Sequence, residues 1–461
     1  MLGLSFGLCV TAFAQTSFDA AKVYNMELSG TARYVAMGGA MAALGSDISI
    51  ISQNPAGIGT YHQSDVNISS SLTGAESRMS PMYTSSHTGF DNGCTYYSHN
   101  TKSGIDGKLI DNMSFVFCGD EDYGDYANFG FSFRRLKNTN CDLDYIDEFD
   151  DSDGYTVFRE FRDHSENIVS AFDFNLSCNL DDVVYFGGNF EVQNVETWSN
   201  GYFYDYYDKG VLPDYPDGFD YTCLDMGTSM DGYGINASFG LIFRPVPVLR
   251  IGMSFKTPTW YQLHLLYNDN LYALRGEEKS GDTYSKHVDF AFSSPWSYNL
   301  SAGLTMGRTA LGMEFERNWT SRSYLSKSNV KIYNQGGAQY RDFSTIRFGL
   351  EHNIDKLALR AGCSHTGSMF RKDATPSFLD TDFNDSRMDF QCIRPGSLNY
   401  VTCGFGYCSA PTEFGTQFYA DMAFVHGVQK QKVCLMEYDE DPVVNYKYIS
   451  NKLQLTIGWC F

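Results

Sequence analysis

The chain has 461 residues, of which 43% are apolar and 16% aromatic, and its formal net charge is −21. After the first residues no run of about 18 apolar residues occurs, which excludes membrane-spanning helices. The acidic balance argues against a nucleic-acid partner, because a phosphate-binding surface needs clustered Lys and Arg. The length would suit about three soluble domains, yet no linker or low-complexity tract divides the chain, so we expect one large domain.

The first residues form a short apolar run. It ends in the small-x-small pattern Ala12-Phe13-Ala14, which is typical of a signal-peptidase site. A basic region before the run is missing, and a buried N-terminal strand or helix is the alternative interpretation. We predict a signal peptide over residues 1–14.

Residues 15–62 contain a Gly- and Ala-rich stretch. Its side chains are too small for a membrane strand, and it is too compact for a linker. Small residues allow close backbone packing, as a plug inside a lumen requires. Pro55 fixes one backbone angle, and Gly57 permits a bend beside it. The residues that we assign to this plug, or hatch, are Gly38, Gly39, Asn54, Pro55, Ala56 and Gly57.

The order of motifs in this stretch resembles the hatch of the FadL/TodX hydrocarbon transporters, in a Bacteroidetes-like form. Ser-Gly-x-x-Arg begins at Ser29, Gly-Gly-Ala follows at Gly38, and Asn-Pro-Ala-Gly begins at Asn54. The resemblance implies a fourteen-stranded outer-membrane barrel with an N-terminal hatch, which imports long-chain fatty acids or aromatic hydrocarbons. A plug of some unrelated barrel is the alternative.

From Ser64 onward, strand-like runs alternate with short turns and long polar connections. Each run is near the ten residues that a tilted membrane strand needs. The expected strands lie at about 64–73, 111–119, 127–138, 166–178, 182–196, 232–244, 248–257, 295–307, 309–320, 342–353, 356–366, 396–409, 413–425 and 448–461. We therefore predict an all-β fold, a transmembrane antiparallel β-barrel of about 14 strands over residues 63–461, with the hatch in its lumen. Short periplasmic turns and long outer loops fit this plan, and both termini are expected in the periplasm.

Alternation within the strands assigns their faces. Ile235, Phe239 and Phe243 are an even number of residues apart, so they would all meet lipid. Lys or Arg at lipid depth costs roughly 2–4 kcal/mol, which selects this register over its one-residue slip. The charged residues expected to face the lumen are Arg134, Asp173, Glu191, Arg244, Arg250, Lys256, Glu314, Glu316, Arg347, Glu351, Arg360 and Asp421. Their mixed signs predict ion-paired ladders rather than a single-sign filter.

The last eleven residues alternate most strictly. Leu453, Leu455, Ile457, Trp459 and Phe461 form one apolar face, and the chain stops on an aromatic residue. This resembles the terminal strand of outer-membrane barrels, in which the barrel assembly machinery reads the final aromatic. That machinery, outer-membrane lipids and lipopolysaccharide are the partners we expect, with the protein a monomer.

Residues 258–294 are the least loop-like of the long connections. Apolar residues recur there at a spacing of three to four, which predicts a helix with one apolar face at the barrel mouth. Such a helix either packs over the mouth or forms a groove where a hydrophobic ligand first binds, as in the resembled family. The groove residues would be Trp260, Leu263, Leu266, Tyr267, Leu271 and Leu274.

The cysteines and the absence of catalytic motifs limit the other functions. Eleven of the 12 cysteines remain after the predicted cleavage, without a CxxC pair or a zinc-like spacing, so we expect mostly free thiols and no metal or other cofactor. Beyond the predicted signal peptide neither GxSxG nor HExxH occurs, and no enzyme is expected. We predict an importer of hydrophobic small molecules by passive, hatch-gated diffusion. A polar-solute porin and a structural or adhesive barrel remain the alternatives.

Overall fold

The computed structural model describes residues 22–24, 27–81, 96–103, 110–119, 125–150, 156–207, 221–275, 278–327, 340–372, 392–434 and 443–461. The signal peptide predicted over residues 1–14 lies outside them. No helix in these ranges is long and apolar enough to span a membrane.

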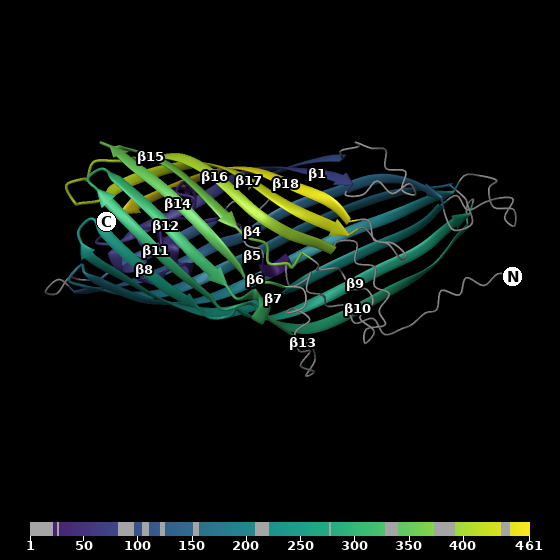
Figure 1. Cartoon of the computed structure of the whole chain (residues 1–461), viewed down its shortest axis with the longest axis horizontal. Helices are drawn as coiled ribbons and strands as arrows, with labels where there is room; N and C mark the ends of the chain where they lie inside the picture. The colour runs from purple at the N-terminus through teal and green to yellow at the C-terminus, as the bar shows by residue number, and fades with distance from the viewer. Residues whose placement is uncertain are drawn as a thin grey trace.

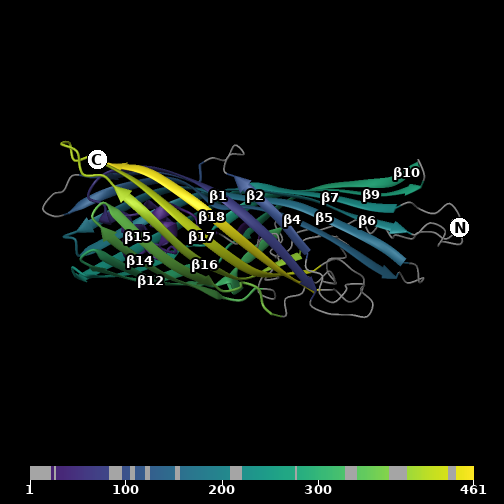
Figure 2. The ribbon, with the colours of Figure 1, turned by 90° about the horizontal axis from the view of Figure 1, so that it is seen from above.

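The strands form one antiparallel sheet that closes on itself as a 14-strand barrel (Figures 1 and 2). Closure runs along β1 and β18, which pair from Asp65↔Cys460 to Pro81↔Val444. In several places two segments lie end to end as one barrel strand: β2 with β3 along β1, and β8 with β9 along β7. β10 with β11 and β12 with β13 are divided in the same way. The predicted fold class and strand number are confirmed.

The strand bounds, in chain order, are as follows. They are β1 (Asp65–Pro81), β2 (Tyr96–Ser103), β3 (Asn112–Cys118), β4 (Tyr126–Asp150), β5 (Thr156–Leu180), β6 (Val184–Tyr207), β7 (Tyr221–Val246), β8 (Leu249–Lys256), β9 (Trp260–Arg275), β10 (Glu278–Ser293), β11 (Ser297–Met306), β12 (Thr309–Asn318), β13 (Tyr324–Lys327), β14 (Phe343–Ile354), β15 (Leu357–Thr366), β16 (Cys392–Cys408), β17 (Gln417–Cys434) and β18 (Val443–Cys460). A short 3-10 turn, η3 (Thr320–Arg322), links β12 to β13.

The outer face of the barrel is apolar and the inner face polar, as the alternation predicted. Phe239 and Met253 point outward and are more than half exposed, and Leu455 and Ile457 of β18 are also exposed. Between those two, Thr456 is buried in the interior. Among the cysteines whose side chains the structure describes, Cys118, Cys178, Cys223, Cys363, Cys403, Cys408 and Cys460 are free.

The two ends of the barrel differ. At one end, here called the turn end, short turns at 181–183, 247–248, 307–308 and 355–356 join the strands. Phe461 lies there too, and its backbone N–H and C=O both pair with Ser64, at 2.9 and 3.0 Å.

At the opposite end, β4, β5, β6, β7, β9 and β10 continue beyond their neighbours as an open curved sheet, here called the extension (Figure 2). Residues 139–150 and 197–207 were expected to be loops and residues 260–274 a helix, and these expectations are wrong, because all three stretches are strand. Because an outer strand face in water need not be apolar, the alternation that marks a lipid-facing strand is missing there.

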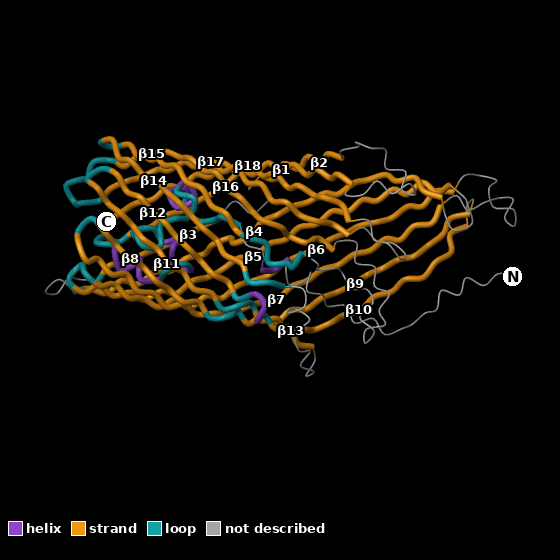
Figure 3. Tube along the Cα trace, viewed as in Figure 1, coloured by secondary structure: helices purple, strands orange, loops and turns teal. Residues whose placement is uncertain are grey.

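Residues 27–62, here called the inner segment, lie inside the barrel toward its turn end (Figures 1 and 3). They form α2 (Ala32–Ala36), η1 (Ile48–Ser52) and η2 (Pro55–Thr60). The side chains of Thr31, Asp47 and Asn54 cap these turns by accepting backbone N–H groups. Apolar side chains of the segment, including Met37, Met41, Ile48, Ile50 and Ile58, form a buried cluster. The same cluster includes Val116, Ala423 and Val425 of the barrel wall, so the segment and the wall share one small core.

Candidate functional site

The inner segment touches the barrel wall backbone to backbone, along a row of glycines. A Cβ at Gly312 would overlap the carbonyl oxygen of Ala40, and one at Gly349 would lie 2.5 Å from that of Met37. These glycines are neighbours across the strands, since Gly312 pairs with Gly303 on β11 and with Gly349 on β14. The row, here called the glycine belt, comprises Gly187, Gly240, Gly303, Gly312, Gly349, Gly362 and Gly404, each too close to the inner segment for a side chain. No gap for a solute remains at these contacts.

Polar side chains of the wall hold the backbone of the inner segment from many directions. Ser177 on β5 donates to the Pro55 carbonyl at 2.6 Å, and Thr402 on β16 donates to the Ala36 carbonyl at 2.8 Å. The Ala32 N–H donates to Thr456 Oγ1 on β18 at 2.7 Å. Buried backbone groups must be paired somewhere, and here the wall supplies the partners.

A partly buried ion pair joins Arg33 of the inner segment to the wall. Arg33 donates from Nε and Nη2 to both carboxylate oxygens of Glu351 on β14, at 2.9 Å each. Glu351 also accepts from Arg360 at 2.6 Å, and Arg360 contacts Asp421 at 2.5 Å. Burial alone would lower the pKa of Arg33, but the Glu351 carboxylate raises it above its usual value, so Arg33 stays charged. The predicted ion-paired ladder is thus present, and it includes the inner segment.

The hatch residues assigned from the sequence lie at these contacts. The Asn54 amide donates to the Leu241 carbonyl on β7 at 3.3 Å, and its oxygen caps Ala56. Gly38 and Gly39 have positive φ angles of 63° and 78°. A Cβ at Gly38 would lie 2.7 Å from the Cys363 backbone, and one at Gly57 would strike Ile50.

The helix predicted over 260–274 is not formed, and this is a correction. The stretch is strand β9, paired along its whole length with β10. Leu263 and Tyr267 are buried on the inner face, whereas Trp260 is 50% exposed on the outer face. Leu271 alternates onto the inner face but is 46% exposed near the end of the extension. Leu266 is partly exposed. Leu274 lies in the strand, but its side chain is not among those that the structure describes. The helical spacing failed because residues three apart fall on opposite faces of a strand.

A different apolar surface appears on the inner face of the extension. Tyr261, Leu263, Leu265 and Tyr267 of β9 pack with apolar residues of the neighbouring strands, and the Tyr261 and Phe292 rings stack at 5.8 Å. We call this group the upper apolar cluster: Val23, Leu136, Val169, Ala171, Val195, Met230, Tyr261, Leu263, Leu265, Tyr267, Val288, Phe290 and Phe292, with Tyr24 beside it. It is an apolar surface inside the barrel, above the inner segment.

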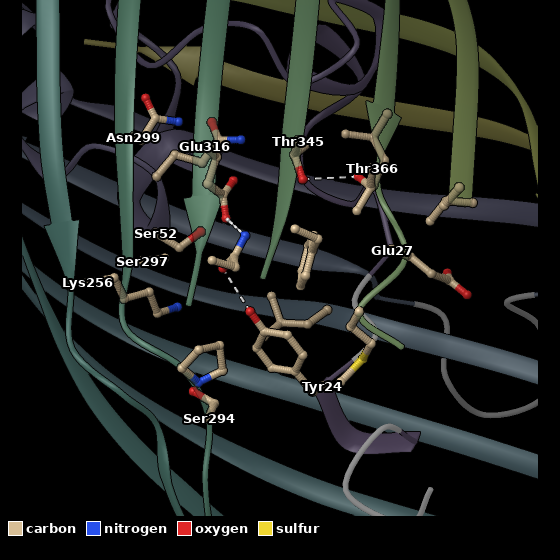
Figure 4. Close-up of a pocket in the computed structure, with 18 of the residues that line it drawn as sticks. Tyr24, Glu27, Ser52, Lys256, Ser294, Ser297, Asn299, Glu316, Thr345 and Thr366 are labelled. Atoms are coloured by element: carbon tan, nitrogen blue, oxygen red, sulfur yellow. Dashed lines mark hydrogen bonds between the residues drawn. The ribbon is translucent and has the colours of Figure 1, made fainter. Parts of the chain in front are cut away.

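A cavity of about 220 Å³ lies between the upper apolar cluster and the inner segment (Figure 4). Tyr24, Leu136 and Tyr261 line it from the side of the cluster, and Ser52 and Gln53 from the inner segment. Tyr24 enters from residues 22–24, and its hydroxyl donates to Asn318 Oδ1 on β12 at 2.8 Å. The cavity thus has an apolar side continuous with the cluster and a polar side formed by the wall.

The charges that line the cavity are paired. Lys256 on β8 lies 3.0 Å from Glu191 on β6, which also accepts from Arg134 at 3.0 Å. On the other side Arg347 contacts Glu316 at 2.7 Å and Glu314 at 3.2 Å. The alternation predicted that these side chains face inward. It did not predict the cavity, because the pairs join strands that are far apart in sequence.

No protein-family model matches the chain, and no curated protein matches its sequence. Solved structures do resemble it in fold. A Pseudomonas aeruginosa FadL homologue matches with a TM-score of 0.57 and 14% identity, over 94% of this chain and 98% of its own. The toluene transporter TodX of P. putida matches with a TM-score of 0.55 and 14% identity, over 94% and 99%.

The monoaromatic hydrocarbon channel CymD matches with a TM-score of 0.53 and 14% identity, over 93% of this chain and 97% of its own. In each case the likeness extends over nearly the full length of both chains. At this level of identity it establishes a shared fold: the chain is built on the barrel fold seen in the FadL homologue, TodX and CymD.

Proposed function

We propose that this chain is an outer-membrane importer of hydrophobic small molecules. The observation that carries the proposal is the cavity between the upper apolar cluster and the inner segment. An apolar solute gains about 0.8 kcal/mol for each methylene that leaves water, so the cluster is a favourable place for it to bind. The similar structures include a toluene transporter and a monoaromatic hydrocarbon channel, which support the same class of solute.

The inner segment serves as the hatch in this proposal. Its contacts with the glycine belt leave no open channel where the two touch, which argues against a polar-solute porin. Transport is passive, and the solute leaves when the hatch shifts against the wall. The short turns face the periplasm, and the extension faces outward into the lipopolysaccharide layer.

The proposal assigns the binding role to one face of β9. Leu263 and Tyr267 contribute to the site, whereas Trp260 and Leu266 on the outer face do not. A polar side chain on the inner face would lower the affinity of the cluster for an apolar solute, because the solute would bury an unpaired amide.

The test is uptake of a radiolabelled alkylbenzene by cells of a Gram-negative host that lacks its own importer. Intact cells are needed because lipopolysaccharide, unlike a phospholipid bilayer, holds back apolar solutes. We expect Leu263→Asn to lower uptake several-fold, and the matched variant Leu266→Asn, on the outer face of the same strand, to leave it unchanged.

Heat-modifiable electrophoretic mobility verifies that each variant is assembled. Uptake that is equal with and without the protein would refute the importer. Free passage of a small polar dye through the wild-type protein would favour the porin instead.

A further inference from the structure

The cavity distinguishes between head groups, and this deepens the proposed function by naming a solute class. We propose that it accepts an uncharged amphiphile, an apolar chain or ring that carries a hydroxyl group, and that it rejects a carboxylate of the same length. The inference rests on the proposed function, in that the cavity is taken to lie on the solute's path. The charges and hydrogen-bonding groups of the cavity wall support this inference.

Every cation among the described residues that line the cavity already has a carboxylate partner. Lys256 is bonded to Glu191, Arg134 to Asp173 at 2.7 Å and to Glu191, and Arg347 to Glu314 and Glu316. An incoming carboxylate would have to displace one of these partners. The displaced carboxylate would then stay buried without a cation, which is strongly unfavourable.

The cavity wall carries no net positive charge. The three cations face Glu27, Glu191 and Glu316 on the cavity wall. Behind the wall, Asp173 and Glu314 add two more carboxylates. Asp173 accepts from Ser132, Arg134 and Asn189, and Glu314 accepts from Ala42, Asn299 and Arg347, so these two groups are already engaged with the wall and the inner segment. An anion in the cavity therefore meets no excess of positive charge.

Hydrogen-bonding groups favour a hydroxyl. Figure 4 shows the Lys256 side chain reaching into the cavity, where its ammonium can donate to an uncharged oxygen and still keep Glu191. Gln53 and Asn299 also line the cavity, and Gln53 Oε1 and Asn299 Oδ1 are buried without a hydrogen-bond donor among the described residues. A hydroxyl group can donate as well as accept, whereas a carboxylate can only accept.

The apolar side of the cavity holds the rest of the molecule. Leu136 and Tyr261 of the upper apolar cluster, with Tyr24 beside them, form this side of the cavity. A head group near Lys256 thus leaves the chain or ring of the solute against apolar surface. A solute with no polar group would fill the apolar side but leave Gln53 and Asn299 without a donor.

The test is equilibrium binding of two chain-matched ligands, radiolabelled decan-1-ol and decanoate, to the full-length protein in nonionic detergent at pH 8. We expect decanol to bind at least tenfold more tightly than decanoate, after subtraction of the signal from protein-free detergent. Decanol and decanoate partition unequally into detergent. This difference cancels when the decanol-to-decanoate affinity ratio of a variant is divided by that of the wild type.

Glu316→Gln removes one carboxylate and leaves Arg347 with Glu314. We expect it to raise decanoate affinity several-fold and to leave decanol unchanged. Glu196→Gln alters the net charge by the same amount on the exposed outer face of β6, and both affinities should stay as in the wild type. Lys256→Met should weaken decanol several-fold without improving decanoate.

Two results would overturn the inference, and they are distinguishable. If the wild-type protein binds decanoate as tightly as decanol, and Lys256→Met abolishes that binding, then the cavity is an anion site; the importer proposal would survive. If neither ligand binds and the alkylbenzene is not taken up by cells, the importer proposal fails together with this one. The wild-type ratio alone decides the matter if a variant does not assemble.

Discussion

Whether a glycine in the barrel wall can be replaced without loss of stability depends on what a side chain there would meet inside the barrel. Gly312 faces the carbonyl of Ala40, whereas a Cβ at Gly74 on β1 would have nothing within 4 Å. In a strand, Gly is usually the less stable choice relative to Ala, by roughly 0.5–1 kcal/mol, so a glycine that is needed must be explained by a close contact.

We therefore expect Gly312→Ala to reduce the free energy of unfolding by about 1–3 kcal/mol, the usual cost of overpacking a filled interior. Gly74→Ala, the matched control, should be neutral or slightly stabilising. Urea unfolding of the protein in liposomes, followed by tryptophan fluorescence, measures both. Equal unfolding midpoints for the two variants would contradict the seating of the inner segment on the wall.

Strand β18 shows how a whole element combines closure with lipid contact. Its inner face bonds the inner segment through Thr456 and Gln454, and its outer face is the apolar row that ends on Phe461. The Phe461 ring lies 6.4 Å from that of Phe115 on β3, so the last aromatic joins the seam to the next barrel strand.

Replacing Phe461 by Gln keeps its backbone bonds to Ser64 but removes the ring. We expect a clear decrease in the amount of assembled protein in the outer membrane, measured by heat-modifiable mobility. Phe414→Gln, in the turn before β17, is the control, because Phe414 is 92% exposed and the change should have no effect. Normal assembly of the Phe461 variant would refute the role of the terminal aromatic.

The sequence predicted best those strands that face lipid on one side and the lumen on the other. Between lipid and lumen, alternation located the strands and the inward charges such as Glu191 and Arg347. β9 was wrong for a physical reason: its outer face lies beyond the lipid-facing region and mixes Trp260 with Gln262 and His264, so only the inner face is apolar. The partners of the inner segment were equally out of reach, since the bond between Ala32 and Thr456 joins residues 424 positions apart.

For the whole molecule, the central question is whether the hatch moves. The Ala32 N–H lies 2.7 Å from Thr456 Oγ1, and both residues are buried. A protein with Ala32→Cys and Thr456→Cys should form a tether between the inner segment and β18 under oxidising conditions.

If transport requires a shift of the hatch at this contact, oxidation should stop alkylbenzene uptake and a reducing agent should restore it. The Ala32→Cys single variant controls for effects of oxidation on the native thiols, of which the seven described are free. Undiminished uptake by a protein that mass spectrometry shows to be fully tethered would exclude movement at this contact.

The glycine belt also fixes the order in which the molecule can be built. Backbone contacts this close leave no room to thread residues 27–62 into a finished cylinder. The segment must already be in place when β1 and β18 meet, so the barrel closes around it. Sequence changes that alter the circumference of the wall must then be matched by changes in the segment it was shaped around. A descendant of this barrel cannot lose its hatch in one step and keep a well-packed interior.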